Sequence, residues 1–313
     1  MEDELRQLAL NQGFHDVGFC VAEPYPEMEH LSQWLEMGCH ADMEYVKRHK
    51  GQRMNPLAFV KSARSIIMVV QAYRTEEMNA PAKDDDKPGL RIARFACSTD
   101  YHETMKKKLY PMVRYLKERR FKARSFVDTA PAMEKLLGAR AGLGRLGRNS
   151  LLIHPRYGSW VMLGGIATSA ELTPSKNFHK SPPECRACGA CIAACPQGAI
   201  HPSGYVDGRR CLSYWTLETD STIAAEVTGN AKGYVAGCDV CQEVCPENAE
   251  ASFVEQSAVL RPIPHHWNAA RLRGLSKEEW EGIFAHSPAA RMGFSRFTQI
   301  AREVEGWDGS ISE

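Results

Sequence analysis

The sequence CRACGACIAACP at residues 185–196 decides the architecture of this chain, and GCDVCQEVCP at residues 237–246 repeats much of its pattern. The first stretch spaces its cysteines as C-x2-C-x2-C-x3-C and ends in Cys-Pro. Bacterial ferredoxins hold cubane iron-sulfur clusters with this run, in which three thiolates bind one cluster and the fourth binds another. The two stretches therefore predict a ferredoxin-like module.

Eight cysteines between residues 185 and 245 supply enough ligands for two 4Fe-4S clusters. Cys211 replaces the first cysteine of the second quartet. Cross-ligation assigns Cys185, Cys188, Cys191 and Cys245 to one cluster, and Cys195, Cys211, Cys238 and Cys241 to the other. A zinc site is the weaker alternative, because a closed zinc site needs only four ligands. Disulfides explain the pattern less well still.

Length and composition indicate a larger protein that uses this module. The chain has 313 residues, which is long enough for two domains, and its formal net charge of +1 points to no particular partner. The start, MEDELRQL, lacks the features of a secretory signal, and the longest apolar run, residues 65–73, is too short to span a bilayer. Eleven cysteines without a leader predict reduced thiols and a cytoplasmic protein, with no membrane partner.

The part of the chain before the cysteines has the pattern of a mixed α+β domain. Residues 2–11 predict a helix, residues 13–21 a half-buried strand with Cys20 in the core, and residues 65–73 a buried central strand. Residues 79–89 contain Pro, Gly and clustered charge, which predicts a surface loop within one domain. The polar segment at residues 173–183 predicts the boundary before the cysteines.

A helix is expected from Asp100 onward, because Asp100 and Glu103 form a capping-box-like pair. Its apolar stripe, which has helical spacing and is assigned to the core, consists of Met105, Leu109, Met112, Val113 and Leu116.

Positive charge is concentrated on the other face of this helix and continues beyond it. The cations are Lys106, Lys107, Lys108, Arg114, Lys117, Arg119, Arg120, Lys122, Arg124, Lys135, Arg140, Arg145 and Arg148. In a nearly neutral protein this concentration predicts an electropositive face that attracts phosphate backbones through counterion release. An ordinary solvated helix explains the charges equally well.

Residues 125–131, SFVDTAP, place Asp128 at the end of a predicted strand, where catalytic groups are often found. The alternative is that Asp128 caps a helix opened by Pro131. The glycines of residues 142–147 fall as G-x-G-x-x-G but follow a helix, so they predict a tight turn near a ligand rather than a dinucleotide site. Residues 150–153 and 158–166 predict two strands that complete the sheet.

Several further motifs resemble the epoxyqueuosine reductases, a family related to the corrinoid-dependent reductive dehalogenases. The motifs are R-x-N-P at residues 53–56, DYH at 100–102, VDTAP at 127–131, AGLGRLGRNSLLI at 141–153, YGSW at 157–160, RRCLSY at 209–214 and GCDVCQEVCP at 237–246. The resemblance covers nearly the whole chain.

The resemblance implies an α+β protein in three parts. A nitroreductase-like cobalamin-binding domain is expected at residues 1–175. A ferredoxin-like domain with two 4Fe-4S clusters is expected at residues 176–250, followed by a helical C-terminal segment at residues 251–313 that packs on the cluster domain. Within that segment, residues 276–284 and 289–304 have helical patterns.

The implied activity is reduction of the epoxide of epoxyqueuosine in tRNA to give queuosine. Electrons pass from a low-potential donor through the clusters to cobalamin, and the tRNA anticodon region binds the basic face between Lys106 and Arg148. Asp128 is the implied acid for the departing oxygen, so burial near the corrin should raise its pKa.

The resemblance also implies a set of residues that contact cobalamin. They are Arg53, Cys97, Asp128, Arg140, Asn149, Ser213 and Asp239. A plain buried thiol explains Cys97 equally well, and Ser213 and Asp239 stand beside ligand cysteines, where they could instead bond cluster sulfurs.

The chain departs from the family pattern at two positions, Arg145 in place of a usual Trp and Gly165 in place of a usual Glu. The first departure leaves open a corrinoid and iron-sulfur reductase of a small molecule, similar to a dehalogenase. A ferredoxin-like electron carrier without enzymatic activity is the other alternative.

Overall fold

The computed structural model describes residues 1–58, 60–79, 89–175, 185, 188–255 and 261–306. The chain forms two compact units. Unit 1 consists of Met1–Ala72, Tyr101–Cys188 and Glu250–Ser252, and unit 2 of Tyr73–Asp100, Gly189–Ala249 and Phe253–Glu313. The segment Tyr73–Asp100, which lies within the first domain expected from the sequence, therefore packs with the cysteine-rich part. Most of the expected loop and of the expected domain boundary lies outside the described residues.

Unit 1 is built on a four-stranded antiparallel sheet in the order β1-β2-β7-β4. The strands are β1 (Asp16–Val21), β2 (Ser65–Ala72), β4 (Ala123–Val127) and β7 (Val161–Thr168). Every residue of β2 is buried, because β2 is a central strand whose two faces are both covered. The predicted strands at residues 13–21 and 65–73 are thus confirmed.

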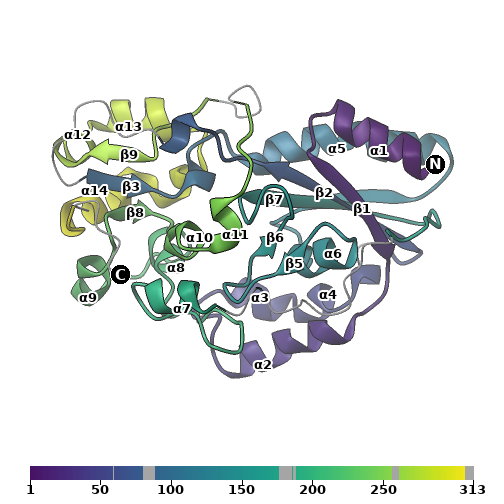
Figure 1. The fold of residues 1–313 in the computed structure, drawn as a ribbon, viewed down its shortest axis with the longest axis horizontal. Helices are drawn as coiled ribbons and strands as arrows, with labels where there is room; N and C mark the ends of the chain where they lie inside the picture. The colour runs from purple at the N-terminus through teal and green to yellow at the C-terminus, as the bar shows by residue number, and fades with distance from the viewer. Residues whose placement is uncertain (59, 80–88, 176–184, 186–187, 256–260, 307–313) are drawn as a thin grey trace. The chain divides into compact units, whose positions relative to one another are not determined.

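Helices cover both faces of this sheet (Figure 1). One face packs on α1 (Glu2–Asn11) and α5 (Tyr101–Glu118), with Ile67 and Val69 of β2 in the shared core. The other face packs on α6 (Glu134–Arg140), with Ile66, Met68 and Val70 in that core. Successive side chains of β2 alternate between the two cores, as the period of a strand requires. The apolar stripe predicted on α5 is buried in the first core.

Unit 1 also contains short helices and a small hairpin outside the main sheet. The helices are η1 (Pro26–Glu29), α2 (His30–Glu36), α3 (Glu44–Arg48), α4 (Lys50–Arg53) and η2 (Pro56–Ala58). The hairpin pairs β5 (Arg145–Leu146) with β6 (Leu152–Ile153). The sequence prediction that both strands after Ser150 complete the sheet was therefore half wrong, since β7 joins the sheet and β6 joins β5.

Unit 2 contains a three-stranded sheet in the order β8-β3-β9. Its strands are β3 (Gly89–Ile92), β8 (Tyr234–Ala236) and β9 (His266–Asn268), and β3 runs parallel to β8. The short helices near the cysteines of this unit are α7 (Ala190–Ala194), α8 (Leu212–Leu217), α10 (Val240–Glu243) and α11 (Pro246–Ala249). Short elements η3 (Glu77–Asn79), η4 (Arg94–Ala96) and α9 (Ala225–Gly229) complete the part before the tail.

The C-terminal tail closes the core of unit 2. It contains α12 (Ala269–Arg273), α13 (Lys277–Phe284), η6 (Pro288–Met292) and α14 (Gly293–Glu303). Trp280, Phe284 and Phe297 from these helices join one core with Tyr234 of β8 and Val240 of α10. The first predicted tail helix is confirmed, and Ser276 caps it with a full capping box. The second is divided at Gly293, where φ is 70°, into η6 and α14.

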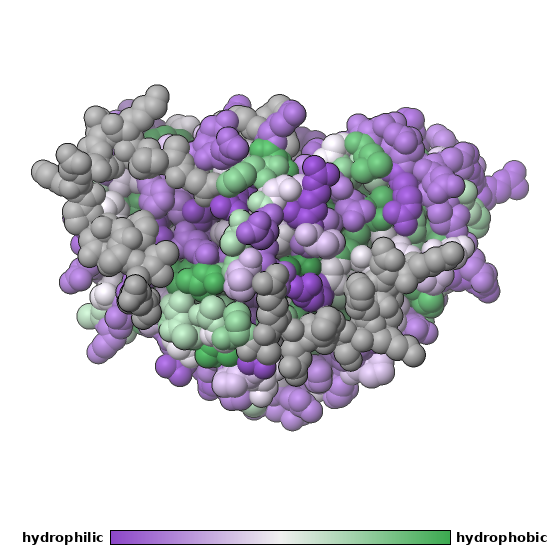
Figure 2. Space-filling view, in the orientation of Figure 1, coloured by the Kyte–Doolittle hydropathy of each residue, from purple (hydrophilic) through white to green (hydrophobic). Residues whose placement is uncertain are grey.

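The fold is a mixed α+β fold, as predicted. In the view of Figure 2, hydrophilic side chains dominate the surface over α1. No helix within the described ranges is both long enough and apolar enough to cross a membrane.

Gly165 offers a test of how tightly the main sheet is packed. A Cβ at this position would lie 2.5 Å from Phe126 Cζ and 2.7 Å from the Ile67 carbonyl oxygen. Phe126 thus occupies the room that a larger side chain at position 165 would need. We expect Gly165→Ala to lower the free energy of unfolding by about 1–3 kcal/mol, as overpacked cores do, measured by urea denaturation.

The matched control is Gly282→Ala on α13, where nothing lies within 4 Å of the added Cβ. This variant should be neutral or slightly stabilising, because alanine favours a helix interior over glycine. Adding Phe126→Leu to Gly165→Ala should recover part of the lost stability. Equal effects of the two glycine substitutions would contradict the packing argument.

Candidate functional site

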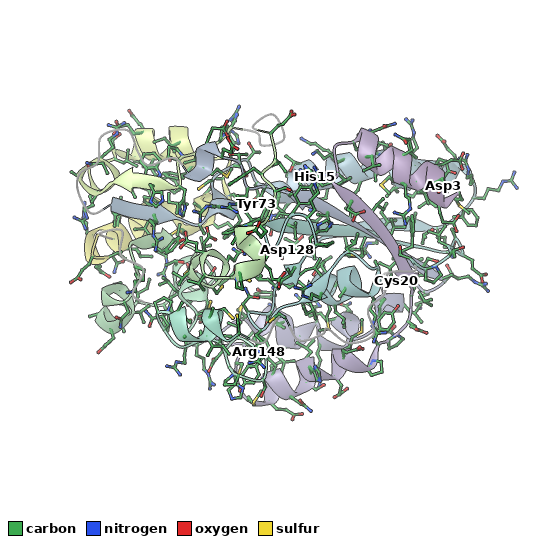
Figure 3. All side chains as sticks on the ribbon, in the orientation of Figure 1. Asp3, His15, Cys20, Tyr73, Asp128 and Arg148 are labelled. Atoms are coloured by element: carbon green, nitrogen blue, oxygen red, sulfur yellow. The ribbon has the colours of Figure 1, made fainter. Side chains whose placement is uncertain are left out.

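Asp128 lies directly after β4, at the end of a strand of the main sheet (Figure 3). Its φ of 33° is positive, a backbone conformation that non-glycine residues rarely adopt and that often marks functional positions. Helix α6 begins only at Glu134, with Met133 as its N-cap. Asp128 is therefore not the cap of that helix, and the alternative reading of this residue is wrong.

His102 holds the Asp128 carboxylate from the first turn of α5. The distance between His102 Nε2 and Asp128 Oδ2 is 3.0 Å. The imidazole is 9% exposed and stacks on the Tyr101 ring at 4.2 Å, whereas the Asp128 side chain is 55% exposed. A buried, stacked ring is a rigid partner, so His102 can orient the carboxylate while one side of it stays open. The described residues alone leave this carboxyl half-exposed.

Glu134 is a second carboxyl residue, and the charge of Asp128 affects its pKa. The residue keeps some exposed surface, but Oε1 is buried and has no hydrogen-bond partner among the described residues. Burial, and next the negative charge of Asp128, raise the Glu134 pKa to about 8. The nearby cation Arg53 acts in the opposite direction without reversing the shift. Glu134 is therefore protonated near neutral pH.

Arg53 lies at the end of α4 and donates from Nη1 to the Ala132 carbonyl oxygen at 3.2 Å. Its Nε is buried without a hydrogen-bond partner among the residues described. A buried donor without a partner is costly, so Arg53 has capacity for a further acceptor. This is the property expected of a residue that contacts a polar ligand.

Arg140 and Asn149 are both engaged within unit 1. Arg140 forms an ion pair with Glu27, and its guanidinium lies 4.4 Å from the centroid of the Tyr25 ring. Asn149 is buried, and its Oδ1 accepts from the Leu151 amide at 3.3 Å. Arg140 thus ties the end of α6 to η1, and Asn149 holds the turn before β6.

The backbone of the glycine turn at residues 142–147 lies close to strand β6 of the β5–β6 hairpin. A Cβ at Gly144 would lie 2.3 Å from the carbonyl oxygen of Ile153 on β6. The prediction of a tight turn is confirmed. The closeness of the backbone there is explained by β6 rather than by a ligand.

In unit 2, Cys97 and Asp239 are both completely buried. The Cys97 thiol lies 3.5 Å from the Ala93 carbonyl oxygen and 3.6 Å from that of Ile92, and burial raises its pKa. Asp239 accepts from the Arg94 amide at 2.8 Å and from Arg94 Nη1 at 3.1 Å. These contacts favour the buried-thiol reading of Cys97 and show that Asp239 ties the residue before α10 to Arg94 of η4. Ser213, on α8, is partly exposed.

The cluster cysteines of unit 2 lie at the ends and within the first turns of short helices. Cys191 is on α7, Cys211 precedes α8, Cys238 and Cys241 flank the start of α10, and Cys245 precedes α11. Burial raises the Cys241 pKa, and the charges of Cys211 and Cys195 raise it further, so these thiols are close neighbours. The Ala199 amide donates to Cys195 Sγ at 3.2 Å.

None of the eleven cysteines, all of which lie within the described residues, forms a disulfide, so the disulfide alternative is wrong. In unit 1, the Arg148 amide donates to Cys185 Sγ at 3.4 Å. Within the described residues, no three His, Cys, Asp or Glu side chains are arranged as ligands of a single metal ion. A cubane does not require that arrangement, because its thiolates bind different iron atoms of one cluster.

The cations predicted to form a basic face divide into two groups. Some are paired with acids, such as Arg114 with Glu118 at 3.4 Å and Arg119 with Glu4 at 3.7 Å. Lys108 is half-buried and donates to Gln71. Lys107 and Lys117 on α5 are exposed, so the face keeps exposed positive charge.

Comparison with known proteins assigns the two parts of the chain. Residues 53–129 match the family model described as "Epoxyqueuosine reductase QueG, DUF1730", and residues 184–248 match "4Fe-4S double cluster binding domain". The epoxyqueuosine reductase of Cellulophaga algicola is 32% identical, over 90% of this chain and 88% of that protein. That of Gloeobacter violaceus is 33% identical, over 98% and 96%.

A solved structure of similar fold is an epoxyqueuosine reductase with an epoxyqueuosine-modified tRNA-Tyr stem loop. It is 25% identical, with a TM-score of 0.82 over 96% of this chain and 80% of that chain. The double-cluster segment and the relatives define the class as iron-sulfur oxidoreductases. More narrowly, this chain belongs to the epoxyqueuosine reductase family.

Two residues of the site were missed by the sequence interpretation. His102 was quoted within the DYH motif without a role, and Glu134 was not considered. The only sequence signal for Glu134 is its place just after the VDTAP motif, which says nothing of its burial.

We expect Glu134→Gln to change how stability depends on pH. The raised Glu134 pKa stabilises the fold below the unfolded value of 4.5, and this contribution is lost as pH rises towards about 8. Between pH 6 and pH 8 the wild type should lose about 2–3 kcal/mol more than the variant, measured by urea denaturation. Glu171→Gln, at an exposed residue, is the control and should follow the wild type.

Proposed function

We propose that this chain reduces the epoxide of epoxyqueuosine in tRNA, using two 4Fe-4S clusters and cobalamin, with Asp128 as proton donor. The observation that carries the proposal is the identity of 32–33% with epoxyqueuosine reductases over nearly the full length. Protein reconstituted without oxygen, with cobalamin, reductant and epoxyqueuosine tRNA, should yield queuosine. Repeated absence of product with both cofactors bound would overturn it.

The cysteines suit two clusters with crossed ligands. The proposed sets are Cys185, Cys188, Cys191 and Cys245 for one cluster, and Cys195, Cys211, Cys238 and Cys241 for the other. Amide donors at Cys185 and Cys195 fit thiolate ligands, because hydrogen bonds to sulfur tune cluster potentials. A low-potential donor supplies the electrons.

The proposed cobalamin domain corresponds to residues 1–175, with a nitroreductase-like arrangement, followed by a cluster domain at 176–250 and a packed tail at 251–313. The proposed contacts are Arg53, Asp128, Arg140 and Asn149 of unit 1, and Cys97, Ser213 and Asp239 of unit 2. The buried Nε of Arg53 fits a polar ligand best. Bound cobalamin supplies strongly reducing power, and an enzyme acting on tRNA is expected in the cytoplasm.

Asp128 supplies the proton that lets the epoxide oxygen leave. His102 orients its carboxyl, and the positive φ directs the residue away from the strand. Because the side chain is half exposed in the free chain, bound cofactor and substrate must exclude water from it. Exclusion of water favours the protonated acid.

Asp128→Asn should retain both cofactors and lose turnover by about 10²-fold or more, the usual contribution of a general acid. Visible and EPR spectra report the cofactors, and queuosine formation reports turnover. Asp3→Asn is a matched control, because Asp3 lies on α1, well away from Asp128 in Figure 3. Full activity of Asp128→Asn would remove Asp128 from the chemistry.

We further expect the basic face from Lys106 to Arg148 to bind the tRNA backbone. Replacing exposed Lys107 and Lys117 together with alanine should weaken tRNA binding and reduce the slope of log affinity against log salt by about 2. Binding measured at several salt concentrations tests this. Lys277→Ala on α13 is the control, and an unchanged slope in the double variant would place the tRNA elsewhere.

A further inference from the structure

The glycine-rich motif after α6 ends in a tight turn between β5 and β6, to which the proposed chemistry gives no role. The Ser150 amide donates to the Gly147 carbonyl oxygen at 2.9 Å, so Arg148 and Asn149 are the two central residues of a β-turn. The φ angle is positive at Ser150, at 59°, and at neither central residue. This is a type I turn followed by a left-handed residue, a common three-residue loop of hairpins.

Close packing fixes the shape of this turn. A Cβ at Gly147 would lie 2.6 Å from Asn149 Oδ1 and 3.0 Å from Ile153 Cδ1. Asn149 is buried, and its Oδ1 also accepts from the Leu151 amide at 3.3 Å. The hairpin therefore sets the direction in which each amide of the turn points.

One amide of the turn donates outside the hairpin. The hairpin bonds use the amides of Gly147 and Ser150, whereas the amide of Arg148 (Figure 3) donates to Cys185 Sγ at 3.4 Å. The hydrogen bond that closes a β-turn does not use the N–H of the first central residue, so this donor can serve another acceptor. Arg148 and Cys185 both belong to unit 1.

We propose that the Arg148 amide holds Cys185 as a cluster ligand and raises the reduction potential of the cluster that Cys185 binds. A cubane held by thiolates is an anion, and the electron that the low-potential donor supplies adds negative charge to it. A hydrogen-bond donor at the thiolate stabilises this added charge, because hydrogen bonds to ionised acceptors are strong and those to cluster sulfurs tune the potential.

Arg148 is thus a positioning residue that acts through Cys185. The step that it influences is the transfer of one electron, in which no bond of the chain forms or breaks. The inference rests on the part of the proposed function that makes Cys185 a cluster ligand, and not on the identity of the substrate.

The test replaces Arg148 with proline and, as the matched control, with alanine. Proline lacks the N–H and is favoured at the first central position of a type I turn, and Gly147 before it has no Cβ to clash with the ring. Arg148→Pro therefore removes the donor and retains the turn, whereas Arg148→Ala removes only the side chain.

The reduction potentials are measured by EPR-monitored titration of protein reconstituted with both clusters. We expect Arg148→Pro to make reduction of one cluster about tenfold less favourable, which lowers its potential by about 59 mV. Arg148→Ala should stay close to wild type. Unchanged potentials in a folded Arg148→Pro variant with both clusters, or equal shifts in the two variants, overturn the inference. Loss of one cluster from Arg148→Pro alone supports the holding role.

A second readout does not depend on the proline variant. Wild type grown with arginine that carries ¹⁵N only at its α-nitrogen should show coupling to one such nitrogen in pulsed EPR of the reduced protein. The coupling should vanish from Arg148→Ala, whose amide nitrogen at this position is unlabelled, and persist in Arg64→Ala, at an exposed arginine. Its absence from the wild type overturns the inference.

Cys185→Ala separates this inference from the proposed ligand set. A Cys185→Ala variant that keeps both clusters unchanged overturns the assignment of Cys185 as a ligand. Loss of a cluster from Cys185→Ala, together with unchanged potentials in Arg148→Pro, overturns this inference alone. Absence of queuosine from wild type that holds both cofactors overturns the proposed reaction, on which neither EPR measurement depends.

Discussion

The burial of charged side chains is the constraint on which both units depend, and the two units meet it differently. In unit 2, Arg94 contacts both Asp239 and Glu243, and Arg91 also contacts Glu243. Removing such charges from water is costly, and partners must offset that cost. Although burial alone would raise the Glu243 pKa, the His265 imidazole, whose Nε2 lies 3.5 Å from Glu243 Oε1, and both arginines hold it well below its usual range. This network ties β3 and η4 to α10, so Tyr73–Asp100 packs with the cysteines.

Unit 1 meets the same constraint by protonation. No ion pair compensates the buried Glu134 oxygen among the described residues, and the nearest acid repels its carboxylate. Neutralising the acid is the less costly solution. A buried pair of opposite charges gives a fixed structure, whereas a buried acid without a cationic partner stays neutral. The first property suits a segment that positions cluster ligands.

The elements with strong local signals could be predicted from sequence. The β2 strand, the α5 stripe and the helical pattern of residues 276–284 depend on patterns within a few residues, and the cysteine spacing belongs to one local motif. The membership of Tyr73–Asp100 in unit 2 depends on contacts with residues 145 or more positions away. The pairing of β6 with β5 likewise depends on packing, because a strand of two residues carries almost no periodicity. Asp128 was predictable as a strand-end residue because a local pattern marks the strand before it. The burial of Glu134 depends on packing and was not predictable.

The main sheet also explains why Asp128 can occupy a strained conformation. Pairing of β4 with β7 ends at Val127 opposite Gly164, so the register fixes the point at which the chain leaves the sheet. Phe126 anchors the strand in the space left open at Gly165. With the strand held on one side and α6 starting at Glu134 on the other, the connecting residues have little freedom. A positive φ at Asp128 is then a consequence of fixed ends, and the hydrogen bond from His102 selects the direction in which the carboxylate points.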